Sequence, residues 1–255
     1  MLHRCIETSN LCETSNDLGA MLARMLLLLL ASPALAVNCL PDGGSYAYSE
    51  SVSGSTRSIT SNLCPNHGTM SVNPNTAELL ATTFTVPRTP MYSPSQATDL
   101  SSVGGPVGIA RSGAQIFSPY PGRRAATTYA NSAPFLEGDT FDQCGGHSAP
   151  SEASYHYHNA PSCLLAQLDM TAGTHSPQVG WAADGFPIYG PLGPNGAAMR
   201  MCSYSGLTEG VDVCLDSCGG YAADTGDGYV YRYYLSGKVN DGTCCVAPAG
   251  GDAYP

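Results

Sequence analysis

Two stretches of this chain repeat one another, and the repeat constrains the fold more than any single motif. Residues 107–119 (VGIARSGAQIFSP) match residues 179–191 (VGWAADGFPIYGP), 72 positions later. In each copy, apolar residues flank a Ser-Gly or Asp-Gly pair, which is typical of two short strands joined by a tight turn. The matching pairs are Val107/Val179, Gly108/Gly180, Ala110/Ala182, Gly113/Gly185, Ile116/Ile188, Phe117/Tyr189 and Pro119/Pro191. The sequence therefore predicts two similar β-hairpins.

A second block follows each hairpin and repeats as well. Residues 142–147 (DQCGGH) match residues 216–221 (DSCGGY) at an offset of 74, and at that offset residues 155–158 (YHYH) fall on residues 229–232 (YVYR). We interpret the chain as a duplicated β-unit, about residues 104–163 and 178–237. The expected fold class is all-β, with mainly short strands and hairpins, few helices and disulfides that stabilise it.

The two copies differ in their histidines. His147, His156 and His158 lie in the first copy, where the second copy has Tyr221, Val230 and Arg232. Successive side chains of a strand point to opposite faces, so a strand over residues 155–158 places His156 and His158 together and the two tyrosines opposite. His147 completes a set of three if the intervening segment folds back as a hairpin. The pattern predicts one imidazole site, in the first copy.

Such a set points to a transition metal. Neutral imidazoles bind zinc and copper, and three of them with an open fourth position are typical of catalytic zinc. His175 is the candidate for a fourth ligand. Asp142 and Asp184 are the candidates for a catalytic base or for a carboxylate that orients a histidine.

The cysteines and the N-terminus indicate the compartment. Residues 21–36 have a short positive region, an apolar core and an Ala-Leu-Ala cleavage signal, so we expect a signal peptide cleaved after Ala36. Residues 1–20, in which ETSN occurs twice, are interpreted as an extension of the gene model, with translation starting at Met21. The apolar run is shorter than the roughly 20 residues that span a bilayer. No transmembrane span is therefore expected in the mature chain, which we predict to be secreted.

Nine of the eleven cysteines follow the leader, which in a secreted protein predicts a disulfide framework. Residues 37–65 are expected to form an N-terminal flap closed by one disulfide, before a domain over residues 66–255. One of the adjacent pair Cys244 and Cys245 is the candidate for the odd thiol. The predicted bridges are Cys39–Cys64, Cys144–Cys163, Cys202–Cys214, and Cys218 with Cys244 or Cys245.

The composition limits the classes of molecule that this chain is expected to bind. The formal net charge is −10 and only 12% of residues are charged, so the clustered Lys and Arg that nucleic-acid binding needs are missing. We expect no nucleic-acid partner; the remaining candidates are a small molecule or an extracellular polymer. The sequence does not define an oligomeric state.

These motifs resemble the YHYH-domain family, which is named for the run at residues 155–158. The resemblance also covers the DQCGGH block and the DGFPIYGP segment at residues 184–191, and it spans roughly residues 66–237. It implies a secreted or surface-attached protein and supplies no reaction. The second copy departs from the pattern by lacking histidines after its Asp-x-Cys-Gly-Gly block, which counts against a function that needs two sites.

Three functions follow in order of preference. The first is a metal-binding domain for zinc or copper, including a metal-dependent enzyme. The second is an extracellular binding or matrix module with structural histidines bonded to the backbone. The third is a metal-free hydrolase that uses a histidine with Asp142 or Asp184.

Overall fold

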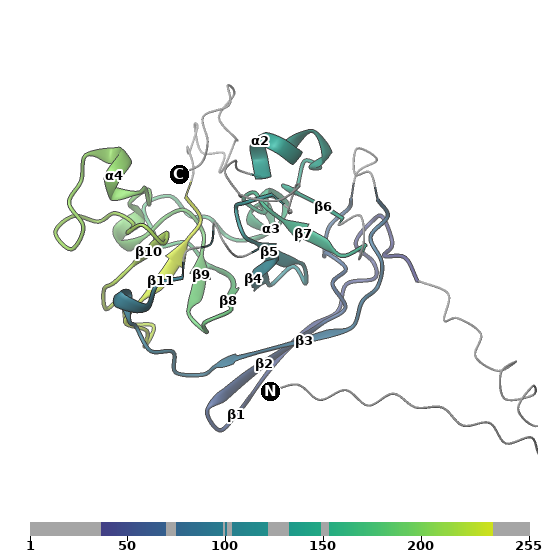
Figure 1. The fold of residues 1–255 in the computed structure, drawn as a ribbon, viewed down its shortest axis with the longest axis horizontal. Helices are drawn as coiled ribbons and strands as arrows, with labels where there is room; N and C mark the ends of the chain where they lie inside the picture. The colour runs from purple at the N-terminus through teal and green to yellow at the C-terminus, as the bar shows by residue number, and fades with distance from the viewer. Residues whose placement is uncertain are drawn as a thin grey trace, which may run out of the picture. The chain divides into compact units, whose positions relative to one another are not determined.

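The computed structural model describes residues 37–69, 75–98, 100, 104–121, 133–148 and 153–236. These residues form mainly β structure in two sheets, which confirms the predicted fold class (Figure 1). Among them, no helix combines the length and the apolar character needed to cross a membrane. The predicted signal peptide, the N-terminal extension and the Cys244/Cys245 pair lie outside the described residues.

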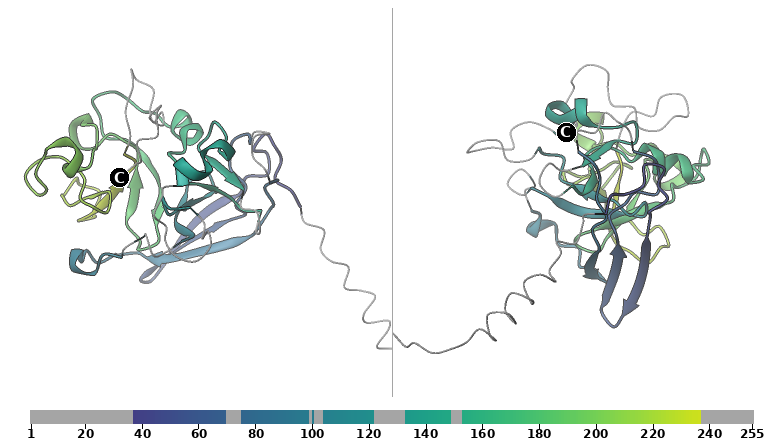
Figure 2. Two further views of the ribbon diagram at one scale, coloured as in Figure 1. Left: turned by 45° about the horizontal axis from the view of Figure 1, so that its top comes forward. Right: turned by 90° about the vertical axis from the view of Figure 1, so that its right-hand side faces the viewer.

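The smaller sheet is a three-stranded antiparallel meander in the order β1-β2-β3. Its first hairpin projects from the rest of the described chain (Figure 2, purple). The strands are β1 (Tyr48–Ser53), β2 (Thr56–Ser61) and β3 (Thr82–Pro87). Ile59 of β2 and Val86 of β3 pack against Ile109 and Trp181, which joins this sheet to the larger one.

The larger sheet has eight strands in the order β10-β11-β9-β8-β4-β5-β7-β6. Read inward from either end, the sheet shows an outer hairpin followed by an inner hairpin: β10–β11 and then β8–β9 from one end, β6–β7 and then β4–β5 from the other. An outer antiparallel hairpin pairs in parallel with an inner hairpin, and the two inner hairpins join through β4 and β8. The strands are β4 (Pro106–Ala110), β5 (Gln115–Phe117), β6 (Gly146–Ser148), β7 (Tyr155–Tyr157), β8 (Gln178–Ala182), β9 (Pro187–Tyr189), β10 (Gly220–Tyr221) and β11 (Arg232–Tyr234). The arrangement agrees with a duplicated unit, whose common origin stays a prediction.

Both predicted inner hairpins are present, as β4–β5 and β8–β9. Each turn needs its glycine, because Gly113 has a φ of 90° and Gly185 a φ of 95°, in the region that side chains with a Cβ rarely adopt. A Cβ on Gly185 would also lie 2.5 Å from the carbonyl oxygen of Pro87. The Ser-Gly and Asp-Gly pairs thus mark the turns, as predicted.

The outer hairpins correct one sequence prediction. Gly146 pairs with Tyr157 in β6–β7, whereas Gly220 pairs with Tyr233 in β10–β11. The residues of the second copy that correspond to residues 155–158 are therefore residues 231–234. The predicted match to residues 229–232 was wrong by two positions. The loop of the second hairpin is longer by two residues, and the residue opposite Tyr221 is Arg232 rather than Val230.

Short helices connect the strands. The α-helices are α2 (Ala133–Glu137), α3 (Ser162–Gln167) and α4 (Cys202–Ser205), and the 3-10 helices are η1 (Pro94–Gln96), η3 (Gly138–Thr140) and η4 (Pro194–Gly196). Three of the helices flank the outer hairpin of the first half: α2 and η3 precede β6, and α3 follows β7.

Three of the predicted disulfides are present. They are Cys39–Cys64, Cys144–Cys163 and Cys202–Cys214. The second brackets the β6–β7 hairpin, with its cysteines just before β6 and in the first turn of α3. Among the described residues Cys218 is not in a disulfide, and its predicted partners lie outside them.

Candidate metal centre

The β6–β7 hairpin brings the three predicted histidines together. His147 and His156 are paired across the two strands, and their Nε2 atoms lie 3.1 Å apart. His158 follows β7 directly, and one ring nitrogen from each histidine lies within 4.8 Å of the others. The hairpin that the sequence analysis required for His147 is therefore present.

The alternation within β7 sorts its side chains as predicted. Tyr155 and Tyr157 are fully buried in the main core on the face away from the histidines. The Tyr155 hydroxyl donates to the Asp142 carboxylate at 2.9 Å, and the Tyr157 hydroxyl lies 2.9 Å from the Ser112 hydroxyl. The two tyrosines anchor the strand, which fixes where its imidazoles point.

Each imidazole has a hydrogen-bond partner at Nδ1. His156 Nδ1 lies 3.0 Å from the Ser154 carbonyl oxygen, and His158 Nδ1 lies 2.7 Å from the Ser118 carbonyl oxygen. A carbonyl can only accept, so both Nδ1 atoms carry hydrogen. His147 Nδ1 lies 2.7 Å from the Thr140 hydroxyl, which itself donates to the Glu137 carbonyl and so accepts from the imidazole.

Burial keeps these rings neutral. Desolvation lowers the pKa of His156 to about 3, although the Ser154 carbonyl opposes the shift. Burial and the neighbouring His158 lower the pKa of His147 to about 4. The pKa of His158 is also lowered, again chiefly by burial. All three are therefore neutral at pH 7.

The tautomers give the site its chemistry. A neutral imidazole with hydrogen on Nδ1 presents a lone pair at Nε2. With these tautomers the Nε2 acceptors of His147 and His156 lie 3.1 Å apart, and a hydrogen bond between the rings would require one of them to move its hydrogen from Nδ1. Two nitrogens bound to one tetrahedral zinc at 2.0–2.1 Å are about 3.3 Å apart. The three imidazoles are suited to hold a metal ion.

The structure adds a carboxylate that the sequence analysis missed. Glu137, at the end of α2, places Oε2 3.6 Å from His158 Nε2 and 3.8 Å from His147 Nε2. It supplies the negative charge that a dication in a buried site needs. Glu137 belongs to no repeat or motif. Only its position five residues before Asp142 placed it near the histidine segment in the sequence.

Two phenylalanines enclose the imidazoles. Phe117 of β5 stacks on His156 with 3.8 Å between ring centroids, and Phe141 packs edge-on against His147 at 4.8 Å. These rings limit the access of water to the nitrogens and hold their orientation. The apolar wall also explains why burial dominates the lowered pKa values.

The remaining predicted site residues lie elsewhere. Asp142 accepts hydrogen bonds from Tyr155 and from the backbone of its own turn, and Asp184 accepts one from Tyr233. His175 Nε2 lies 2.7 Å from the Tyr234 hydroxyl. The structure does not bring His175 into the histidine group, and it places both aspartates in bonds to tyrosine.

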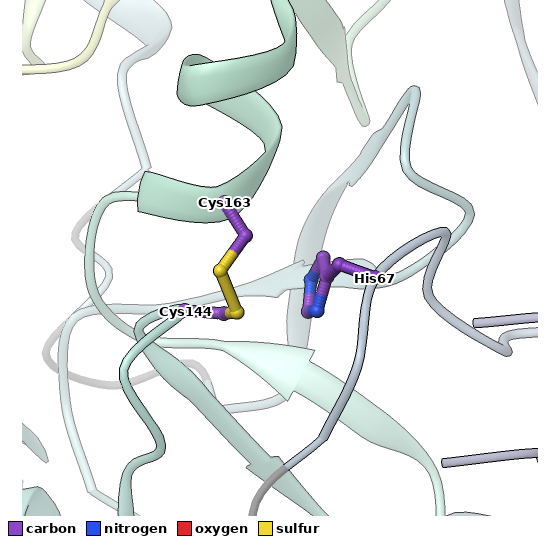
Figure 3. A group of neighbouring side chains, drawn as sticks. All are labelled: His67, Cys144 and Cys163. Carbon is purple, nitrogen blue, oxygen red and sulfur yellow. A yellow bond between two sulfur atoms is a disulfide. The ribbon is translucent and has the colours of Figure 1, made fainter. Parts of the chain in front are cut away.

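A second group lies beside the bracketing disulfide. The ring of His67 is close to Cys144 and Cys163, whose sulfurs are joined (Figure 3). His67 Nδ1 lies 3.0 Å from the Gly68 carbonyl oxygen, and its Nε2 is bonded to the Tyr157 hydroxyl. With both nitrogens engaged and the sulfurs oxidised, this group supports the core rather than presenting ligands.

In the second outer hairpin, an arginine side chain occupies the place that corresponds to the imidazoles. Arg232 is fully buried and lies opposite Tyr221, as His156 lies opposite His147. Its guanidinium bonds Asp227 at 2.6 Å and also donates to the carbonyls of Ala223 and Tyr229. This half therefore carries a fixed charge pair where the first half carries imidazoles.

Comparison with known proteins gives one match. No curated protein and no solved structure is similar to this chain at a significant level. The model of a family described as YHYH protein matches residues 83–210, which are half of the chain and include both inner hairpins and the histidine-bearing hairpin. The chain therefore belongs to the YHYH protein family.

Proposed function

We propose that this protein binds a transition-metal ion, zinc or copper, through His147, His156 and His158. The observation that carries the proposal is the 3.1 Å approach of two Nε2 lone pairs inside a buried, uncharged pocket of imidazoles. Without a cation between them, these lone pairs repel. A dication converts the repulsion into two bonds, and the third imidazole adds another.

Glu137 is the charge partner in this proposal. An ion among three neutral imidazoles brings an uncompensated charge into an apolar site, which is costly. The carboxylate beside His147 and His158 offsets that charge, either as a ligand or as an acceptor for a metal-bound water. Zinc at such a site would supply an activated water with a pKa near ~7, and copper would supply one-electron chemistry.

The scaffold supports a preformed site. Each Nδ1–H is held by an oxygen, and such contacts fix ring orientation and raise ligand basicity. The disulfide across the ends of the hairpin ties its two strands together. Three disulfides among the described residues suit an oxidising compartment, and we propose that the protein acts outside the cytosol.

The binding-module alternative has one observation in its favour. His156 and His158 are bonded through Nδ1 to backbone carbonyls, as structural histidines would be. It explains the Nδ1 contacts and leaves the convergence of the Nε2 atoms without a reason. The metal-free hydrolase needs Asp142 or Asp184 at a histidine of the site, whereas their carboxylates bond Tyr155 and Tyr233.

Metal content of the protein tests the proposal. The protein would be secreted without a metal-binding tag, purified without chelator and measured by inductively coupled plasma mass spectrometry, alone and after dialysis against zinc or copper. We expect about one ion per chain, lost in a His156→Ala/His158→Ala double variant. His175→Ala is the matched control, because it removes a half-buried histidine outside the group and should retain the ion.

Two results would contradict the proposed metal site. Wild type that stays metal-free after reconstitution with either ion, while folded by circular dichroism, would reject metal binding and leave the binding-module reading. A double variant that keeps the same stoichiometry would place the ion elsewhere in the chain.

A further inference from the structure

A pocket of about 350 Å³ lies away from the histidines, between the small sheet and the second half of the large one. Its walls come from β2, the residues after β3, the β8–β9 turn and the loop before β11. The residues that matter most are Arg57, Arg88, Phe186, Asp227, Tyr229 and Val230. Two arginines at one pocket stand out in a chain with a net charge of −10.

Arg57 is held firmly and still has hydrogen-bonding capacity. Its Nη1 donates to Glu50 at 2.9 Å, and its guanidinium lies 3.8 Å from the ring centre of Trp181. Its Nε is buried, and no described residue accepts its hydrogen. A buried donor without an acceptor costs free energy. Because Nε is closed to solvent, an acceptor in the pocket would meet the terminal nitrogens of the guanidinium rather than Nε.

Arg88 supplies the second cation. Its side chain is exposed, and no ion pair of Arg88 is found within the described part of the chain. Its backbone is fixed by a hydrogen bond from its N–H to the Ser55 carbonyl at 2.8 Å. The pocket thus has one anchored and one free guanidinium.

The acid in the pocket is already neutralised. The Asp227 carboxylate accepts from Arg232 at 2.6 Å, from the Tyr189 hydroxyl at 2.9 Å and from the Tyr229 N–H at 3.0 Å. Its charge and lone pairs are used within the chain, and Glu50 balances Arg57, so Arg88 is the cation of this pocket that no described carboxylate pairs with.

We propose that this pocket binds a small ligand that carries a carboxylate or sulfate group. Guanidinium groups hold such oxyanions through paired N–H donors, and the planar fork fits the planar carboxylate. Tyr229 and the exposed Val230 add aromatic and apolar surface for the body of the ligand, and the volume accommodates a single sugar ring or a group of similar size. The site is separate from the histidines and does not depend on a metal.

Trp181 provides the assay. It is the only tryptophan of the chain and lies under the Arg57 guanidinium, so its fluorescence reports on that cation directly. The probes are glucuronate, glucose 6-sulfate, glucose, acetate and inorganic sulfate, titrated at constant ionic strength. We expect a saturable change with the two charged sugars and none with glucose.

Variants identify the residues. Arg88→Gln should weaken binding of the charged sugars about tenfold or more, since it removes the charge-assisted hydrogen bonds of a guanidinium that no described carboxylate pairs with. Arg57→Lys keeps the charge and removes the planar guanidinium fork, and should weaken binding as well. Arg200→Gln, which removes an exposed arginine outside the pocket, should bind as wild type does. Thermal melts confirm that each variant is folded.

Several outcomes decide the matter. Acetate or sulfate binding as tightly as the sugars would assign the oxyanion alone as the ligand, and tighter binding of the sugars would assign the acidic sugar. Glucose binding as well as glucuronate, Arg88→Gln binding as wild type, or no saturable change with any charged probe would overturn the proposal.

Discussion

Acid should destabilise the metal-free protein well above the pH at which carboxylates titrate, and His156 should account for a defined share of the loss. Burial lowers the pKa of His156 to about 3 in the folded protein. In the unfolded chain it returns to its usual value near ~6.5. The unfolded state therefore binds the proton first, so stability is present above about pH 6.5 and is lost as the pH falls.

The size of the effect follows from the two pKa values. Between pH 7 and pH 5 the folded ring stays neutral while the unfolded ring becomes protonated, which lowers the free energy of unfolding by about 2 kcal/mol for this residue. His147 and His158 shift in the same direction and add to the loss. The window lies above the usual carboxyl pKa values of about 4, so acidic residues contribute little to it.

Urea unfolding followed by Trp181 fluorescence measures this loss, with the disulfides intact and a chelator present. Wild type and His156→Gln would be compared at pH 7 and pH 5. The variant should lose about 2 kcal/mol less than wild type over this range, whatever its stability at pH 7. Equal losses in the two proteins would refute the assignment of a buried, neutral His156.

Three further results are expected. Glu137→Gln should weaken metal binding about 10–100-fold without unfolding the protein, whereas Asp139→Asn, on the exposed side of the same turn, should leave the titration unchanged. Replacing Cys144 and Cys163 by Ala should lower the free energy of unfolding by about 3 kcal/mol, since the bridge closes a loop with a separation of 19 residues. A urea unfolding curve identical to that of wild type would contradict this. Gly185→Ala should cost at least about 1–2 kcal/mol, because its Cβ would meet a backbone carbonyl oxygen at 2.5 Å in a left-handed conformation, and wild-type stability would count against that geometry.

Local patterns predicted the parts of the site that depend on period and spacing. Alternation of tyrosine and histidine in residues 155–158 gave both the strand and the sorting of its faces, because successive side chains of a strand point to opposite sides. The Ser-Gly and Asp-Gly pairs gave the two turns. Cysteines at either end of the hairpin gave its disulfide. Each of these is a relation between residues near one another in the chain.

The misplaced register shows where such patterns stop. Residues 229–234 read YVYRYY, with tyrosine at every second position, so a shift of two residues preserves both the alternation and the buried face. Only the pairing with Gly220 selects the register. Glu137 and the Arg57–Arg88 pocket were missed for a related reason. Glu137 meets its histidines only through the fold of the segment between them, and the pocket joins segments far apart in the sequence; no local period encodes either.

The distribution of strand lengths has a consequence for self-association. Both outer strands of the large sheet are short, with three residues in β6 and two in β10, so each free edge offers few unpaired backbone groups. Such edges give a neighbouring chain little to add onto. The longer free edges belong to the small sheet, where β1 has six residues and a largely exposed surface. Among the described strands, the edge of the meander is therefore the better place for a second chain to add a strand, and it lies in a different sheet from the histidine-bearing hairpin.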